Sequence, residues 1–182
     1  MPTPIGHLFA GAVIRQSVET DLRRNLWFTA ALLFFALLPD IDFIFGFAVG
    51  DVNRYHHLFT HSFIFVLGAG LLGGRMFSLR SAKMALNVSA IFVLAGISHV
   101  LLDCLALDQR PPYGCPLLWP FSNRFFISPV VLFSDVSRSS DSKLFFSSLF
   151  NLHNLRTVAI EAAVLMPLWA VVWSVTRKKN VA

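Results

Sequence analysis

Residues 84–105 read MALNVSAIFVLAGISHVLLDCL, an apolar run with a histidine and an aspartate near its end. At a rise of 1.5 Å per residue, a helix of this length is about 33 Å long, enough to cross the ~30 Å hydrocarbon core of a bilayer. His99 and Asp103 are four residues apart, so they lie on one face of that helix. A carboxylate at a helix C-terminus is unfavourable unless something offsets its charge. A shared cation would offset it; a His–Asp hydrogen bond that locks two helices is the alternative.

The composition predicts a membrane protein. The chain has 182 residues, of which 55% are hydrophobic and 14% are charged, and its mean hydropathy is +0.65. Soluble domains carry about a quarter charged residues, so a water-soluble enzyme or a disordered tail is excluded. The two cysteines, Cys104 and Cys115, are too few for a disulfide framework, and we expect free thiols. The net charge of +5 comes without the basic stripe of a nucleic-acid surface, so we expect the lipid bilayer and no nucleic acid as partner.

Four more apolar segments complete an all-α integral membrane bundle of about five helices. They are Pro4 to about Val18, Asn25–Leu38, His61–Phe77 and about Asn154–Thr176. We expect the last two and residues 84–105 to span the membrane, and the first two to form a short N-terminal hairpin. The second segment should end at Pro39, with extended backbone beyond it, because a residue before proline avoids helical geometry.

The whole chain, residues 1–182, is predicted to be a single domain. Residues 108–150 are rich in proline and then in serine, and they predict a long structured loop over one end of the bundle. A short amphipathic piece is expected within Leu144–Leu152.

Charges separate along an up-and-down path through these segments. One end collects most of the basic residues, namely Arg15, Arg23, Arg24, Arg75, Arg80, Lys83, Arg177, Lys178 and Lys179. The opposite end holds most carboxylates and all the histidines. The positive-inside rule places the basic end in the cytoplasm and the histidine end in the periplasm or outside the cell.

Two further motifs offer metal ligands. Asp40 and Asp42 follow Pro39, and two close carboxylates repel unless one is protonated or a cation lies between them. A solvated turn is the alternative.

Residues 55–62 read YHHLFTHS, and neutral imidazole is a common transition-metal ligand. His56 and His61 converge if the loop wraps back onto the helix start, whereas His57 should point elsewhere, toward substrate. An interfacial histidine cluster is the alternative.

Glu161 and His7 extend the set. Glu161 lies inside an apolar run, and an intramembrane carboxylate is a functional candidate by default. Its alternative is pairing with Arg156 or with a polar residue of a neighbouring helix. His7 starts the first segment at the same end, where a packing histidine is the alternative.

Together these residues exceed the four ligands of a structural zinc site. The predicted ligands are His7, Asp40, Asp42, His56, His61, His99, Asp103 and Glu161. Such a set suits two or three divalent cations, zinc first, with manganese or iron as alternatives. Bridged ions clamp a phosphoryl group and activate water, which makes hydrolysis the natural reaction class.

The sequence resembles the YdjM-like inner-membrane proteins, a family described as LexA-binding, metal-dependent hydrolases. The resemblance rests on Gly6-His7, on LPDID at 38–42, on His56-x4-His61-Ser62, on HVLLD at 99–103 and on YGCPLLWPFS at 113–122. It implies metal binding and hydrolysis in the inner membrane. The family often reads His-Arg-Gly-Phe-Thr-His-Ser, whereas His57 and Leu58 replace the arginine and glycine here.

The combined expectation is a membrane-bound metal-dependent hydrolase of a phosphoester or a lipid-linked phosphate. His57 and Asp108 are the candidate acid/base residues. Arg110 and Arg124 should hold the anionic group, and Trp119 should close over the site or anchor at the interface, where tryptophan is favoured. A divalent-cation transporter and a non-catalytic metal-stabilised scaffold are the alternatives.

Overall fold

The computed structural model describes residues 1–79 and 81–179, and these residues form helices and loops without a β-strand. The longer helices are α1 (Pro4–Gln16), α3 (Leu26–Leu37), α5 (Phe63–Phe77), α6 (Ala82–Cys104) and α8 (Leu152–Lys179). The short ones are α2 (Thr20–Arg24), α4 (Phe43–Val49), α7 (Phe145–Ser148) and the 3-10 turns η1 (Leu38–Asp42) and η2 (Phe59–His61). The five longer helices match the five predicted apolar segments, which confirms the all-α fold class.

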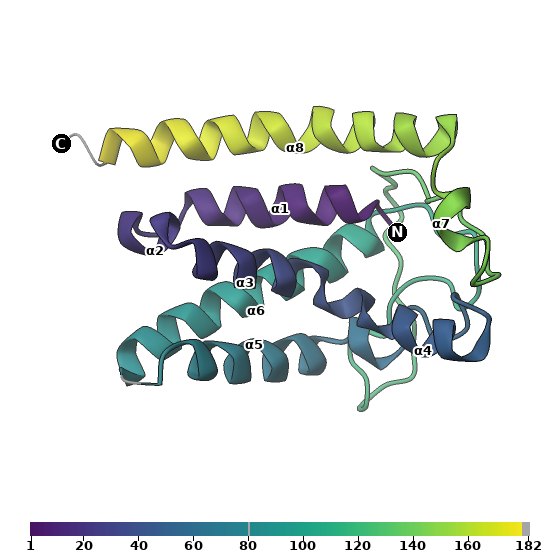
Figure 1. The fold of residues 1–182 in the computed structure, drawn as a ribbon, viewed down its shortest axis with the longest axis horizontal. Helices are drawn as coiled ribbons and strands as arrows, with labels where there is room; N and C mark the ends of the chain where they lie inside the picture. The colour runs from purple at the N-terminus through teal and green to yellow at the C-terminus, as the bar shows by residue number, and fades with distance from the viewer. Residues whose placement is uncertain (80, 180–182) are drawn as a thin grey trace.

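The longer helices run along one axis, with α8 beside α1 and α5 beside α6 (Figure 1). Helix α6 is the centre of the bundle because it contacts α1, α3 and α5. Phe28 and Leu32 of α3 are buried against Val88 and Phe92 of α6 in an apolar core. Helix α5 approaches α6 closely, since a Cβ added at Gly74 would lie 2.2 Å from the Ser89 Oγ.

Three helical runs are long and apolar enough to cross a membrane: Leu26–Val49, Ala82–Cys104 and Leu152–Arg177. The last two were predicted as spans. The third predicted span, now α5, is a shorter helix, and α3 continued through η1 and α4 takes its place. Little of the α8 span is buried within the protein, which suits a helix that faces lipid.

Pro39 does not end the second helical segment, contrary to the prediction. The chain passes from α3 directly into η1 and then into α4. Pro39 lies in the first turn of η1, where its missing N–H breaks no hydrogen bond, so the proline is tolerated. As a result, Asp40 and Asp42 lie on a tight helical turn rather than on extended backbone.

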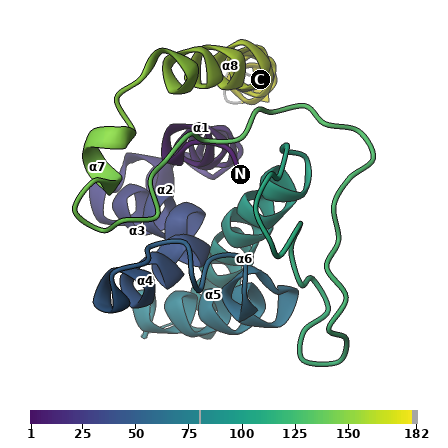
Figure 2. The ribbon, with the colours of Figure 1, turned by 90° about the vertical axis from the view of Figure 1, so that its right-hand side faces the viewer.

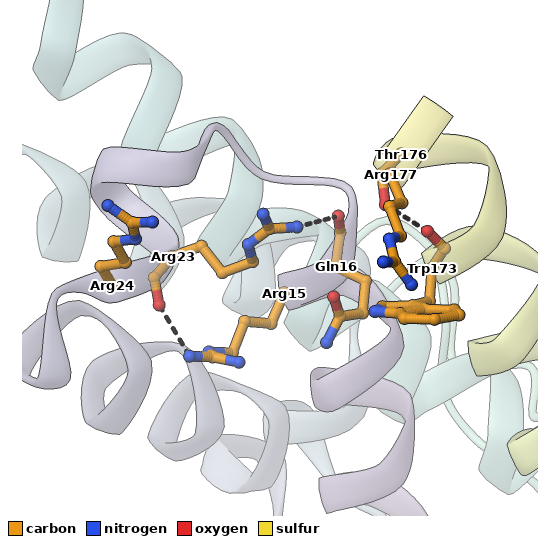
Figure 3. A pocket seen from close by; sticks show the side chains of 7 residues that line it. All are labelled: Arg15, Gln16, Arg23, Arg24, Trp173, Thr176 and Arg177. Atoms are coloured by element: carbon orange, nitrogen blue, oxygen red, sulfur yellow. Dashed lines mark hydrogen bonds between the residues drawn. The ribbon is translucent and has the colours of Figure 1, made fainter. Parts of the chain in front are cut away.

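The two ends of the bundle differ. The segment between α6 and α8 wraps around the end at which α1 begins and α6 ends, and α7 is its one helix (Figures 1 and 2). Four arginines gather at the other end: Arg15, Arg23, Arg24 and Arg177 (Figure 3). The predicted separation of charge is therefore present. Arg80 and the side chains of Lys178 and Lys179 lie outside the described residues.

Candidate metal centre

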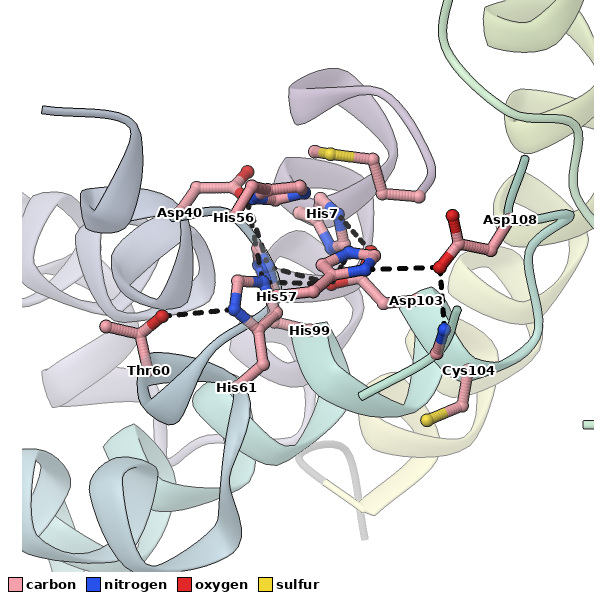
Figure 4. Close-up of polar contacts among 12 residues, drawn as sticks. His7, Asp40, His56, His57, Thr60, His61, His99, Asp103, Cys104 and Asp108 are labelled. Carbon is pink, nitrogen blue, oxygen red and sulfur yellow. Dashed lines mark hydrogen bonds and ion pairs between the residues drawn. The ribbon is translucent and has the colours of Figure 1, made fainter. Parts of the chain in front are cut away.

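All the predicted metal ligands except Glu161 meet at the loop-covered end of the bundle. Figure 4 shows six of them: His7, Asp40, His56, His61, His99 and Asp103. Helix α1 contributes His7, and η1 contributes Asp40 and Asp42. The loop before α5, with η2, contributes His56, His57 and His61, and the last turns of α6 contribute His99 and Asp103. These residues form overlapping groups of three whose ligand atoms lie within 4.8 Å of one another.

The centre of the cluster is a pair of imidazoles on one carboxylate. The Nε2 atoms of His61 and His99 lie 3.3 and 3.2 Å from the Asp103 Oδ2. Asp40 Oδ1 is the fourth atom of the group and lies 3.6 Å from His99 Nε2 and 3.8 Å from His61 Nε2. Two ligands of one tetrahedral zinc ion, at bond lengths of about 2.0–2.1 Å, lie about 3.3 Å apart. The spacing of these four atoms is therefore close to the spacing of ligand atoms around one shared metal ion.

The same atoms lack hydrogen bonds within the described chain. The Nε2 atoms of all five clustered histidines, Asp40 Oδ1 and both oxygens of Asp103 are buried without a hydrogen-bond partner. A buried polar atom left unpaired costs about 1–3 kcal/mol, and a charged one costs more. So many unpaired donor atoms pointing to one place fit a bound divalent cation.

Hydrogen bonds on the far side of the rings fix which nitrogen faces the cluster. His99 Nδ1 donates to the Ala36 carbonyl at 2.7 Å, so Nε2 is the nitrogen that faces the cluster. His56 Nδ1 lies 3.1 Å from Asp42 Oδ1, and His61 Nδ1 lies 3.3 Å from Asp42 Oδ2. Thr60 Oγ1 also donates to Asp42. Asp42 thus orients two histidines, as carboxylates behind metal-binding histidines do.

His57 joins the cluster, although it was expected to point elsewhere. Its backbone φ is +61°, a left-handed conformation that is uncommon outside glycine, although asparagine, aspartate and histidine adopt it more often than other residues. His57 Nδ1 lies 3.4 Å from Asp108 Oδ2, and its Nε2 lies 3.9 Å from Asp103 Oδ2. The two predicted acid/base residues are therefore neighbours at the rim of the cluster.

Electrostatics differ across the histidines. Burial lowers the pKa of His56 and of His57, so both rings are neutral at pH 7. Burial also acts on His61, but the three carboxylates beside the ring, those of Asp103, Asp40 and Asp42, outweigh it and raise its pKa well above the usual range. Asp108 is partly buried, yet its contacts with His57 and Gly114 lower its pKa to about 2. The carboxylates therefore favour a positive charge at the point where His61 Nε2 faces Asp40 and Asp103.

Glu161 is not brought into the cluster. It shares none of the ligand groups found among the described residues. Its Oε1 accepts from the Thr3 N–H at 2.6 Å, and its Oε2 accepts from the Thr3 hydroxyl. A Cβ at Gly6 would lie 2.7 Å from Oε2, so the glycine makes room for the carboxylate at the N-terminus of α1. The positive end of the helix dipole stabilises the charge there, which gives Glu161 a structural partner on a neighbouring helix.

A small polar mouth opens above the cluster. Its lining includes His56, His57, Asp108, Arg110 and Arg138. Arg138 is 8% exposed, its Nε donates to Asn53 Oδ1 at 2.7 Å, and its Nη1 is buried without a hydrogen-bond partner. Arg110 donates through Nη2 to the Arg138 carbonyl at 2.7 Å, and its Nη1 is likewise unpartnered. Both guanidinium groups therefore have an Nη1 atom without a hydrogen bond beside the histidines, although that of Arg138 forms an ion pair with Asp135 Oδ1 at 4.0 Å.

The other predicted substrate residues lie outside this mouth. Arg124 is exposed, and Trp119 packs beside Phe59 with ring centroids 5.7 Å apart. Sequence reasoning missed Arg138, because a serine-rich loop offers no periodicity from which to place a side chain. It also missed Cys115, whose sulfur lies within 4.8 Å of ligand atoms of His57 and Asp103. Cys104 and Cys115 are both buried and free, as predicted.

Comparison with known proteins agrees with the resemblance seen in the motifs. A family model described as YdjM inner membrane protein matches residues 1–181. The chain belongs to the YdjM inner membrane protein family. No curated protein and no solved structure matches the chain. Family membership and the three apolar spans together establish a membrane protein, and the buried His/Asp groups of this YdjM protein can hold a metal ion.

Proposed function

We propose that this YdjM protein is a metal-dependent hydrolase of a phosphoester or a lipid-linked phosphate, with its site at one face of the inner membrane. The observation that carries the proposal is the position of two guanidinium groups, each with an Nη1 atom that makes no hydrogen bond, beside a buried cluster of imidazoles and carboxylates that lack hydrogen bonds. Imidazole and carboxylate attract divalent metal, and arginine donors match the oxygens of phosphate. The groups that would bind the metal and the groups that would bind the phosphate therefore lie next to each other.

The residues that would hold the metal are His61, His99, Asp40 and Asp103, with His7 and His56 at the edge of the group. We infer two or three divalent ions, zinc first, because the donor atoms exceed what one ion takes. Divalent ions in such a site supply Lewis-acid polarisation of a phosphoryl oxygen and lower the pKa of a coordinated water. Asp42 and the Ala36 carbonyl keep the histidine rings in the tautomer that this needs.

His57 and Asp108 are the pair suited to proton transfer. His57 directs Nδ1 toward Asp108 Oδ2 at 3.4 Å, and with the proton on Nδ1 the neutral ring keeps a lone pair on Nε2, which faces the cluster. Asp108 stabilises the positive charge that His57 gains on accepting a proton. The mouth above His57 has a cavity volume of about 20 Å³, room for one water molecule. A phosphoester is larger than this cavity and therefore enters only when the residues that line it move apart.

The experiment measures hydrolysis of p-nitrophenyl phosphate and bis-p-nitrophenyl phosphate by purified protein loaded with zinc or manganese. Arg138→Gln should lower kcat/KM about ten- to a hundredfold, because a charged hydrogen bond contributes about 1.5–3 kcal/mol. Arg124→Gln, which removes the same charge from an exposed position of the same loop, should leave kcat/KM unchanged. Metal-loaded wild-type protein that hydrolyses neither compound nor a phospholipid headgroup would overturn the proposal.

The alternatives have less support. A cation transporter needs a polar path to the other end of the bundle, whereas Phe28, Leu32 and Phe92 fill the core between α3 and α6. A non-catalytic scaffold gives no reason for arginine Nη1 atoms without hydrogen bonds in the pocket beside the cluster.

The orientation follows from the positive-inside rule, with the metal end in the periplasm. In intact cells, an impermeant thiol reagent should label Ser140→Cys and spare Lys83→Cys, since both positions are exposed at opposite ends. The reverse pattern would place the metal end in the cytoplasm.

A further inference from the structure

A second polar pocket lies at the end of the bundle opposite the metal centre. It has a volume of about 370 Å³ and lies between the last turn of α1, helix α2 and the last turns of α8 (Figure 3). Its lining is Arg15, Gln16, Arg23, Arg24, Trp173, Thr176 and Arg177. Four arginines from three helices therefore surround one cavity.

Three of the four guanidinium groups are held in place by the protein itself. Arg15 donates from Nη2 to the Arg23 carbonyl at 2.7 Å and from Nε to Thr29 Oγ1 at 2.9 Å. Arg23 donates from Nη1 to the Gln16 carbonyl at 3.4 Å. Arg177 stacks over the Trp173 ring, 5.2 Å from its centroid. Because these side chains are already ordered, a ligand loses less affinity to side-chain entropy.

The positive charge in this pocket is not balanced by the protein. Among the described residues, no carboxylate oxygen lies within 4.0 Å of these four guanidinium groups. The acids nearest in sequence, Glu19 and Asp21, line a separate cavity with Lys83. The positive-inside rule explains why arginines occur at this end, but not why four of them converge around a cavity away from the available acids.

We propose that this pocket binds the phosphate of an anionic phospholipid headgroup. Arginine forks match phosphate oxygens, and basic pockets between helices at the cytoplasmic side suit acidic headgroups. The lipid, rather than free phosphate, is indicated by the wall of the pocket. Trp173 belongs to a helix that exposes Val171 and Val175 in the same turns, so acyl chains would lie along α8 while the phosphate sits among the arginines. This site is independent of the metal centre and of the hydrolase proposal.

The test is a lipid titration of the purified full-length protein in detergent, followed by native mass spectrometry. Phosphatidylglycerol should bind more tightly than phosphatidylcholine. Arg24→Gln removes an exposed guanidinium that makes no hydrogen bond or ion pair among the described residues, and it should weaken phosphatidylglycerol binding about fivefold. Arg24→Gln/Arg177→Gln should weaken it about 25-fold if the two effects add. Lys83→Gln removes one charge from the same end outside the pocket and should leave binding unchanged.

Three results would overturn the proposal. Equal binding of the two lipids would exclude a site for anionic headgroups. An equal loss in Lys83→Gln and Arg24→Gln would mean that the whole charged end, and not this pocket, attracts lipid. Binding of glycerol 3-phosphate as tight as that of phosphatidylglycerol would show a site for soluble phosphates instead. Unchanged thermal unfolding of each variant, followed by circular dichroism, separates these results from misfolding.

Discussion

Asp103 and Glu161 are both carboxylates inside apolar helices, both near the loop-covered end of the bundle, and both are almost fully buried. Their surroundings differ. Glu161 accepts two hydrogen bonds from Thr3 at the start of α1. Neither oxygen of Asp103 has a hydrogen-bond partner, and the imidazoles of His7, His61 and His99 approach it within 3.2–3.5 Å.

The difference shows what turns a buried acid into a candidate metal ligand. A helix N-terminus and a hydroxyl group compensate the charge of Glu161 without any ion. Asp103 lies at the negative end of α6, where the helix dipole makes the same charge less favourable. A cation shared with the surrounding imidazoles supplies the missing compensation.

The largest expected effect comes from removing the metal. Zinc at a thousand times its Kd stabilises the folded state by about 4 kcal/mol, so chelation should lower the thermal midpoint of the wild-type protein by several degrees. Without chelator, Asp103→Asn should unfold at about the same temperature as the chelated wild-type protein. Adding the chelator should not change the thermal midpoint of this variant. Circular dichroism melts in detergent, with zinc and with EDTA, measure both. A wild-type midpoint that is unaffected by chelation would contradict the account.

A smaller effect is expected from changing Asp42, which contacts the rings of His56 and His61. Asp42→Asn leaves Asp40, His99 and Asp103 intact but loosens the rings of His56 and His61, and should weaken zinc binding about 10- to 100-fold. Competition with a chromophoric zinc chelator measures the affinity. Asp51→Asn, an exposed acid of the same end, is the matched control. If both variants bind zinc equally well, Asp42 has no orienting role.

The smallest effect is expected at Glu161. Glu161→Gln should keep full metal content and lose about 1 kcal/mol of stability, because a neutral amide interacts more weakly with the N-terminus of α1. A double-mutant cycle with Thr3→Val should give a non-additive result, since the two side chains are in contact. Additive losses would mean that the contact between Thr3 and Glu161 does not stabilise the protein.

Much of this arrangement could be predicted from local sequence. The apolar length of residues 84–105 predicts α6, and the four-residue spacing of His99 and Asp103 predicts a shared face. Pro39 misled the prediction because a proline that ends one helix can equally begin the next, and no local signal distinguishes the two cases.

The remaining features depend on tertiary contacts. The role of Glu161 depends on Thr3, which is 158 positions away in the chain. Arg138 lines the pocket from an irregular loop, whose side-chain directions follow no periodic pattern. His57 faces the cluster because its backbone is left-handed, and the sequence alone does not predict that conformation. Only the folded chain brings these residues to the cluster.

Elemental mass spectrometry of three purified proteins, wild type, Asp103→Asn and Glu161→Gln, tests the central claim most directly. We predict at least one equivalent of zinc, manganese or iron in the wild type, the same content in Glu161→Gln, and loss of that metal in Asp103→Asn. Wild-type protein without bound divalent metal after purification in zinc-containing buffer would contradict the account, as would full metal content in Asp103→Asn.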